Sequence, residues 1–103
     1  MLLARQGGGA VGFALFAPNA TAVELYYLAV DPDAWGAGVA SLLLTCVDDD
    51  ARVLGCDALE LWVIDDNERA IAVYERSGWV RTEQTKRDAP LSRLERRFVK
   101  HLN

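Results

Sequence analysis

The stretch Leu28-Ala-Val-Asp-Pro-Asp-Ala-Trp-Gly-Ala-Gly-Val-Ala-Ser-Leu-Leu-Leu44 decides how the rest of the chain is interpreted. An apolar strand ends at Asp31-Pro32, a short turn holds Gly36 and Gly38, and an apolar helical pattern follows at once. A strand, a glycine turn and a helix together direct free backbone N–H groups and the positive end of a helix dipole at one anion. Because glycine has no Cβ, the backbone at this turn can approach a phosphate closely. The stretch therefore predicts an anion-binding turn.

Hydrophobic runs and turn residues divide the remaining sequence into a mixed α/β order. We expect a β-hairpin around three successive glycines, a strand, a helix ending at Gly55, a strand parallel to the first, a second helix and a strand pair. Besides that first helix, the predicted elements are Leu2 to Arg5, Val11 to Phe16, Ala22 to Val30, Ala58 to Ile64, Glu68 to Ser77, Trp79 to Lys86 and Leu94 to Leu102. The fold class is thus a mixed α/β layer with helices on its faces, in a single domain over residues 1–103.

Periodicity predicts which side chains face the core. On the strand 22–30, alternation places Glu24, Tyr26, Leu28 and Val30 on one face, and both faces are apolar enough to be covered. Asp50 projects close to the centre of the apolar arc of the following helix, without an evident partner. The predicted members of that arc are Val39, Leu42, Leu43, Cys46, Val47, Val53 and Leu54.

Composition narrows the classes of protein. The formal net charge is −4, which argues against the basic surface that nucleic-acid binding needs. No apolar run is long enough to span a bilayer, and no signal peptide is evident at the start, so we expect no membrane partner. Cys46 and Cys56 have no metal-ligand spacing, so we expect no metal site and place the chain in the reducing cytoplasm.

Two phosphate-binding motifs compete for the glycine turn. A P-loop needs a Lys after its second Gly, and none is near. A dinucleotide-binding turn needs a third Gly where Ser41 stands, although Asp57 lies at a suitable distance for the ribose contact. A small nucleotide-binding domain of Rossmann type therefore stays open as an alternative.

The turn together with Asn67-Glu-Arg-Ala-Ile-Ala-Val-Tyr-Glu-Arg-Ser-Gly-Trp79 resembles the GNAT superfamily of acetyl-CoA-dependent N-acetyltransferases. Gly38-Val39-Ala40 fits the end of the family's cofactor turn, and five residues fit its later helix: Asn67, Ala70, Tyr74, Gly78 and Trp79. Trp35 stands where the family has Gln or Arg. The chain begins where the third or so element of the family begins, so we expect the first strand and two helices, which wall the acceptor site, to be missing.

The resemblance implies acetyl-CoA as the cofactor and a role for each matched residue. The diphosphate would lie on the N–H groups of Gly36, Ala37, Gly38, Val39 and Ala40, with Trp35 beside them. The pantetheine arm would pair with the backbone of Leu28 and Val30, and the Leu28 N–H would polarise the thioester carbonyl. Asn67 would cap its helix and contact the pantetheine, and Tyr74 would be the general acid.

The acceptor side of the reaction is predicted from one strand. Glu24 lies four residues before Leu28 on the same expected face, so its carboxylate is the candidate base, with Tyr26 lining the acceptor pocket. The predicted function is transfer of an acetyl group to a primary amine of a small molecule or peptide. The alternatives are a non-catalytic acyl-CoA-binding module, or half of a partner-dependent GNAT assembly. An open sheet edge makes a homodimer plausible.

Overall fold

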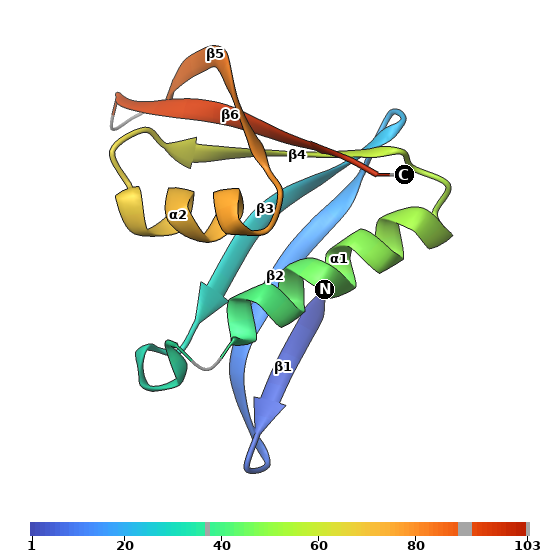
Figure 1. Cartoon of the computed structure of the whole chain (residues 1–103), viewed down its shortest axis with the longest axis vertical. Coiled ribbons are helices and arrows are strands. Elements are labelled where there is room, and N and C mark those ends of the chain that lie inside the picture. The colour runs from blue at the N-terminus through green and yellow to red at the C-terminus, as the bar shows by residue number, and fades with distance from the viewer. Residues whose placement is uncertain (37, 89–91, 103) are drawn as a thin grey trace.

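Six strands form one sheet in the order β1-β2-β3-β4-β6-β5, in a computed structural model that describes residues 1–36, 38–88 and 92–102 (Figure 1). β3 pairs parallel with β4, and the other neighbouring strands pair antiparallel. The elements are β1 (Leu2–Gln6), β2 (Gly9–Asn19), β3 (Ala22–Val30), the 3-10 helix η1 (Pro32–Ala34), α1 (Val39–Val53), β4 (Ala58–Ile64), α2 (Glu68–Arg76), β5 (Val80–Asp88) and β6 (Arg93–His101). The predicted mixed α/β fold is confirmed.

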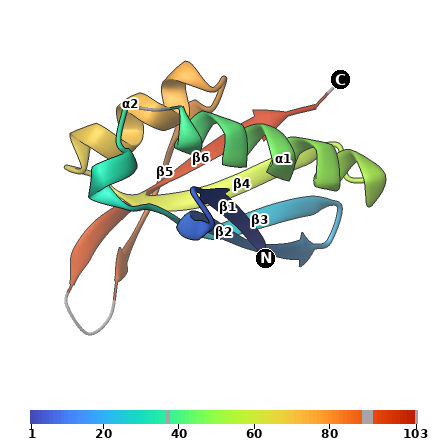
Figure 2. The same cartoon turned by 90° about the horizontal axis from the view of Figure 1, so that it is seen from below.

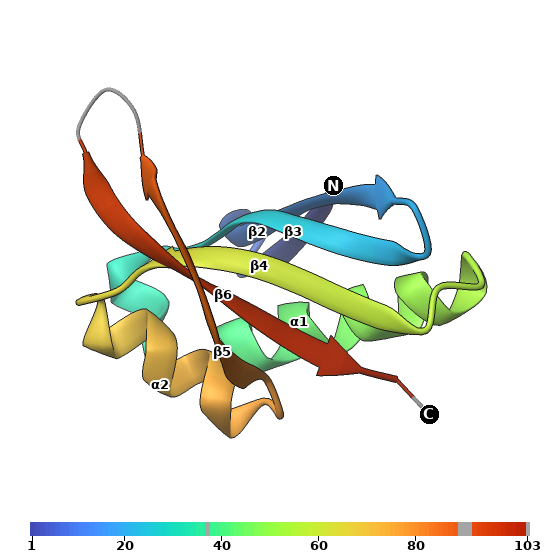
Figure 3. The ribbon, with the colours of Figure 1, turned by 90° about the horizontal axis from the view of Figure 1, so that it is seen from above.

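Both helices lie on the same face of this sheet, as Figures 2 and 3 show from opposite sides. The prediction that helices cover both faces, and that β3 is buried on both sides, is therefore wrong. Large side chains on the opposite face are exposed, among them Phe13 and Leu15 of β2 and Tyr27 of β3. The hydrophobic core lies between the sheet and the helices, around Phe98, Leu59, Leu61 and Leu44.

The buried arc of α1 differs from the predicted one. The structure buries Leu43, Leu44, Val47, Asp48 and Ala51, whereas Leu42 and Leu54 are exposed and Val53 is 87% exposed. Helix and sheet are in close contact near Gly12 of β2, where a Cβ would lie 3.3 Å from both Val39 Cγ1 and Leu43 Cδ1. This contact and the small Ala51 favour an arc that runs along Leu44 and Ala51 rather than Leu42 and Val53.

The buried carboxylate of α1 is Asp48, and Asp50 is only half-buried. Lys100 of β6 donates from Nζ to Asp48 Oδ2 at 2.6 Å and to the Ser77 carbonyl at 2.7 Å. One ammonium therefore joins α1, the end of α2 and β6. The sequence pattern selected the wrong aspartate because Lys100, which stabilises the inward charge, lies far away along the chain.

A β-bulge interrupts β3 and reverses its side-chain alternation. Leu15 of β2 pairs with Tyr27 and Phe16 pairs with Leu25, so Tyr26 is an extra residue. Leu25 is buried in the core, and Leu28 packs against the same core three residues later, an odd spacing that regular alternation does not allow. Glu24 therefore points to the sheet face away from the helices, and the expectation that it shares a face with Leu28 is wrong.

Candidate functional site

The parallel strands β3 and β4 pair over only part of their length. The register runs from Ala22 opposite Ala58 to Leu25 opposite Leu61. Beyond this point β4 continues to pair with β6 as far as Ile64, while β3 continues to Val30 without pairing to β4. The edge of β3 from Tyr26 to Val30 that faces β4 thus has backbone groups available to an extended ligand.

A pocket of about 750 Å³ adjoins this unpaired edge. Its walls are the end of β3, the glycine turn, the first turn of α1 and one side of α2. Leu28 and Val30 line it from β3, and Asn67 and Tyr74 line it from the α2 side. The fold therefore brings together two sequence segments that lie about forty residues apart.

The glycine turn supplies uncapped backbone donors to the pocket. Gly36 and Gly38 have φ angles of +84° and +79°, a backbone conformation that residues with a Cβ rarely adopt. Gly38 is the N-cap of α1 and offers no side-chain hydrogen bond to the helix. Together with Val39 and Ala40 these glycines line the pocket, where the first N–H groups of α1 have no acceptor within the helix. Ala37 lies outside the described residues.

Trp35 connects the two walls of the pocket. Its Nε1 donates to the Val30 carbonyl at 2.9 Å, and the Arg69 guanidinium lies over its ring, with Cζ 3.5 Å from the centroid. Arg69 and Arg76, both on α2, line the pocket and bring positive charge to it. Sequence reasoning missed both arginines. Their spacing of seven residues on one helix is the signal that would have found them.

Tyr74 is the buried titratable side chain of the pocket. It is 9% exposed, and its ring lies 6.0 Å from that of Trp79 between centroids. Burial raises the pKa of the Tyr74 hydroxyl to about 12. The phenol is therefore protonated at neutral pH and remains a hydrogen-bond donor. At the start of α2, the Asn67 side chain accepts from the Ala70 N–H at 3.2 Å, which confirms the predicted cap.

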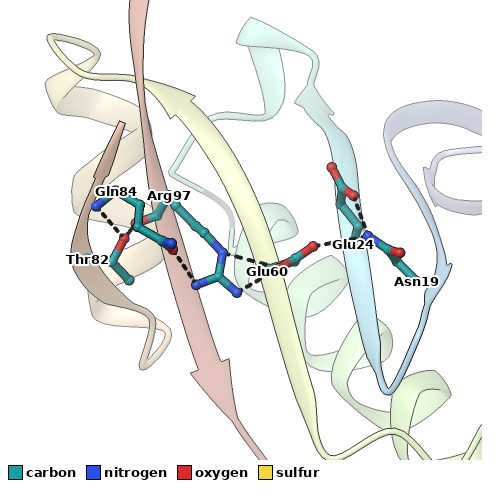
Figure 4. A network of polar contacts seen from close by, with 6 residues as sticks. All are labelled: Asn19, Glu24, Glu60, Thr82, Gln84 and Arg97. Carbon is teal, nitrogen blue, oxygen red and sulfur yellow. Dashed lines mark hydrogen bonds and ion pairs between the residues drawn. The ribbon is translucent and has the colours of Figure 1, made fainter. Parts of the chain in front are cut away.

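Glu24 does not line this pocket. It lies on the opposite sheet face, where its Oε1 accepts from Asn19 Nδ2 at 3.2 Å (Figure 4). Its neighbour on β4 is Glu60, the register partner of Glu24. The pair Glu24–Glu60 lies one residue before the last paired position of β3 and β4, so Glu24 is at the point where the strands diverge. Tyr26, in the bulge, does not line the pocket either.

The sequence model of the Acetyltransferase (GNAT) family matches residues 1–79. The chain belongs to the GNAT family. No curated protein matches the chain closely enough to count as a relative. In the described part of this GNAT chain, no helix is long and apolar enough to cross a membrane.

Solved GNAT structures resemble this chain over nearly all of its length. The ribosomal-protein-S18-alanine N-acetyltransferase from Escherichia coli is 26% identical with a TM-score of 0.81, over 96% of this chain and 66% of that one. An IAA acetyltransferase from Bacillus cereus is 20% identical with a TM-score of 0.81, over 97% and 75%. The PaiA N-acetyltransferase from Thermoplasma acidophilum, in complex with coenzyme A, is 19% identical with a TM-score of 0.83, over 96% and 58%.

The chain thus spans about three fifths to three quarters of the length of these three proteins. Family membership and the antiparallel start of the sheet decide against the Rossmann-type alternative. In this GNAT chain, every predicted cofactor-site residue that the structure describes lines one pocket. The predicted acid, Tyr74, lies in that pocket, whereas the predicted base, Glu24, lies on the far side of the sheet.

Proposed function

We propose that this GNAT chain transfers the acetyl group of acetyl-CoA to a primary amine of a small molecule or peptide by direct attack. The observation that supports the proposal best is the unpaired edge of β3, which adjoins a pocket at the uncapped start of α1. An extended pantetheine arm fits such an edge as an added strand, and a diphosphate fits such a helix start.

The binding residues follow from this placement. The N–H groups from Gly36 to Ala40 would hold the diphosphate, and the guanidinium groups of Arg69 and Arg76 would add charge complementarity. The backbone of Leu28 and Val30 would align the arm. Trp35 already donates to the Val30 carbonyl, so its indole competes for one acceptor on this edge.

Bound acetyl-CoA would supply an activated carbonyl and a thiolate leaving group. The Leu28 N–H would stabilise negative charge that develops on the carbonyl oxygen. Tyr74, with its pKa of about 12, would donate a hydrogen bond to the departing sulfur. Complete loss of its proton would leave a phenolate in a buried site, so hydrogen bonding is the role that the environment of Tyr74 favours over full proton transfer.

The acceptor amine would approach from the face without helices. A cofactor in the pocket occupies the helix side of the divergence between β3 and β4, so the opposite side stays open to an amine. Glu24 lies on that side and would take the proton that the amine must lose, directly or through water.

A second candidate is a chain that binds acyl-CoA without catalysis or that needs a partner. The exposed Leu3, Phe13, Leu15 and Tyr27 on the open face favour it, because such apolar groups often mark an interface. β1 at the sheet edge would allow homodimerisation. We expect the protein to act in the cytoplasm, with Cys46 and Cys56 as free thiols.

Thermal unfolding with acetyl-CoA, coenzyme A and NAD tests the binding step. A ligand at a hundred times its Kd adds about 2.7 kcal/mol of stability, which moves the unfolding midpoint by roughly 10 °C or more in a domain of this size. We expect a rise with both coenzyme A forms and none with NAD. A flat response to all three would refute the proposal.

Release of the coenzyme A thiol with a panel of polyamines, small amines and peptides tests the chemistry. An acetyltransferase would lose turnover on Tyr74→Phe and Glu24→Gln while it retained the thermal shift with acetyl-CoA. Binding without turnover of any amine would favour the second candidate.

A further inference from the structure

We propose that Arg97, Glu60 and Asn19 form a positioning chain that sets the orientation and the electrostatic environment of the Glu24 carboxylate. The inference rests on the proposed role of Glu24 as the base. Glu24 would touch the amine, whereas the other three residues act only through it. Figure 4 shows the chain of contacts across four strands, from Asn19 on β2 to Arg97 on β6.

Asn19 holds the two carboxylates in a fixed relation. Its Nδ2 donates to Glu24 Oε1 at 3.2 Å and to Glu60 Oε1 at 3.3 Å. An amide NH2 carries two hydrogens, so it can serve both acceptors at once. Without this bridge, two carboxylates that are register partners on adjacent strands would repel each other. Asn19 thereby keeps Glu24 beside Glu60.

Arg97 compensates the charge of Glu60 and not that of Glu24. Its Nη2 and Nε donate to Glu60 Oε2 at 2.7 and 3.2 Å, and its Nη1 donates to Gln84 Oε1 at 2.8 Å. The Glu60 side chain is 17% exposed, so its ion pair is partly shielded from water. Three charged groups, Arg97, Glu60 and Glu24, then sum to −1, and the uncompensated charge is at Glu24.

The uncompensated charge of Glu24 lies where the acceptor amine would bind. Glu24 lies where β3 and β4 diverge, on the face left open for the acceptor. A negative site there attracts a protonated amine, and the same carboxylate can accept the proton that must be removed. The class of acceptor substrate that this charge favours is thus a cationic primary amine.

The side chains next to Glu24 on β3 and β2 carry no positive charge. Tyr26 and Tyr27 follow it on β3, its partner on β2 is Ala17, and Leu15, the partner of Tyr27, is apolar. Lys86 of β5 places its Nζ 4.4 Å from the centroid of the Trp62 ring. Glu95 is the acidic residue of β6, and it pairs with Ile64, four residues beyond Glu60 along β4.

Two neutralising variants should act in opposite directions. Arg97→Gln leaves the Glu60 charge uncompensated beside Glu24, and Glu60→Gln leaves a free positive charge there. We expect the acid limb of the pH profile of kcat to move to higher pH in R97Q and to lower pH in E60Q, because the two variants change the charge beside the Glu24 carboxylate in opposite directions. The double variant should return close to the original value, and Arg52→Gln, which removes an exposed ion pair on α1, should change nothing.

These profiles are measured with acetyl-CoA and the amine that gives the highest turnover. KM for acetyl-CoA should stay unchanged in every variant. A merely structural network would lower activity in R97Q and E60Q alike without opposite shifts, which would overturn the inference. An acid limb that stays in place in both variants would also overturn it.

Failure of the proposed function is a separate result. A protein that shows no thermal shift with acetyl-CoA and no turnover refutes the proposed function itself. A protein that turns over acetyl-CoA but shows no opposite shifts supports the proposed function and refutes the positioning chain.

Discussion

Replacement of Tyr74 by Phe should change how the stability of the protein depends on pH. Burial raises the pKa of Tyr74 from about 10 in an unfolded chain to about 12 in the fold. A raised pKa means that the folded state keeps its proton after the unfolded state has lost it. The associated stability is therefore complete below pH 10 and is lost as the pH rises toward 12.

The magnitude follows from the two pKa values. One proton over two pH units corresponds to about 2.7 kcal/mol of unfolding free energy, and about 1.3 kcal/mol of it falls between pH 9 and pH 11. Urea unfolding of the wild type and of Y74F across this range isolates the contribution, because the titration of all other groups is common to both proteins. The difference in unfolding free energy between them should shift by about 1.3 kcal/mol.

A matched control is Tyr27→Phe, since Tyr27 is 64% exposed on the open face. Its difference from the wild type should stay flat over the same range. An equally flat difference for Y74F would show that the Tyr74 hydroxyl is not buried as the structure has it, and would refute the raised pKa. In turnover, Y74F should lower kcat by about tenfold to a hundredfold, as for one hydrogen bond to a charged group, with KM for acetyl-CoA unchanged.

Three further variants test the packing and the pocket. Lys100→Met should cost about 3–5 kcal/mol in urea unfolding, because Asp48 is buried and its Oδ2 accepts from Lys100, and an added Asp48→Asn should restore part of it. Gly12→Ala should cost about 1–3 kcal/mol, since its Cβ would lie 2.9 Å from the Ala29 carbonyl oxygen, whereas Gly9→Ala, with a nearest atom at 3.9 Å, should be mild. Trp35→Phe keeps a ring under Arg69 but frees the Val30 carbonyl, so the Kd for acetyl-CoA measured by calorimetry should fall about fivefold, and an unchanged Kd would show that this carbonyl is not used.

Local signals in the sequence accounted for the order of elements and for one wall of the site. The strand Ala58–Ile64 was predicted with its observed bounds, and the turn at Gly36 and Gly38 adopts the positive φ angles that glycine allows. These features depend on residues that are neighbours in the chain. The predicted cap at Asn67 is of the same kind.

Features that depend on distant partners were predicted less well. The inward aspartate of α1 was assigned to position 50 rather than 48, because its partner Lys100 comes from the last strand. The Arg69 side chain was not assigned to the pocket, because its contact with Trp35 forms only when α2 packs beside the glycine turn. Periodicity ranks the faces of an element but carries no information on which distant group is available to each face.

The bulge at Tyr26 matters most for the proposed function, since one extra residue would assign the two halves of β3 to different sides of the proposed reaction. Strict alternation would place Glu24 beside Leu28, with acid, base and cofactor crowded into one pocket. The bulge instead leaves Leu28 at the pocket and turns Glu24 to the open face, where Asn19 donates a hydrogen bond to it and Glu60 is its partner on β4. The bulge leaves two consecutive side chains of β3, Tyr26 and Tyr27, exposed, whereas regular alternation would bury one of them. In the proposed reaction the cofactor would enter the gap between β3 and β4 from the helix side and the amine from the open face, so the two substrates would meet where the strands diverge.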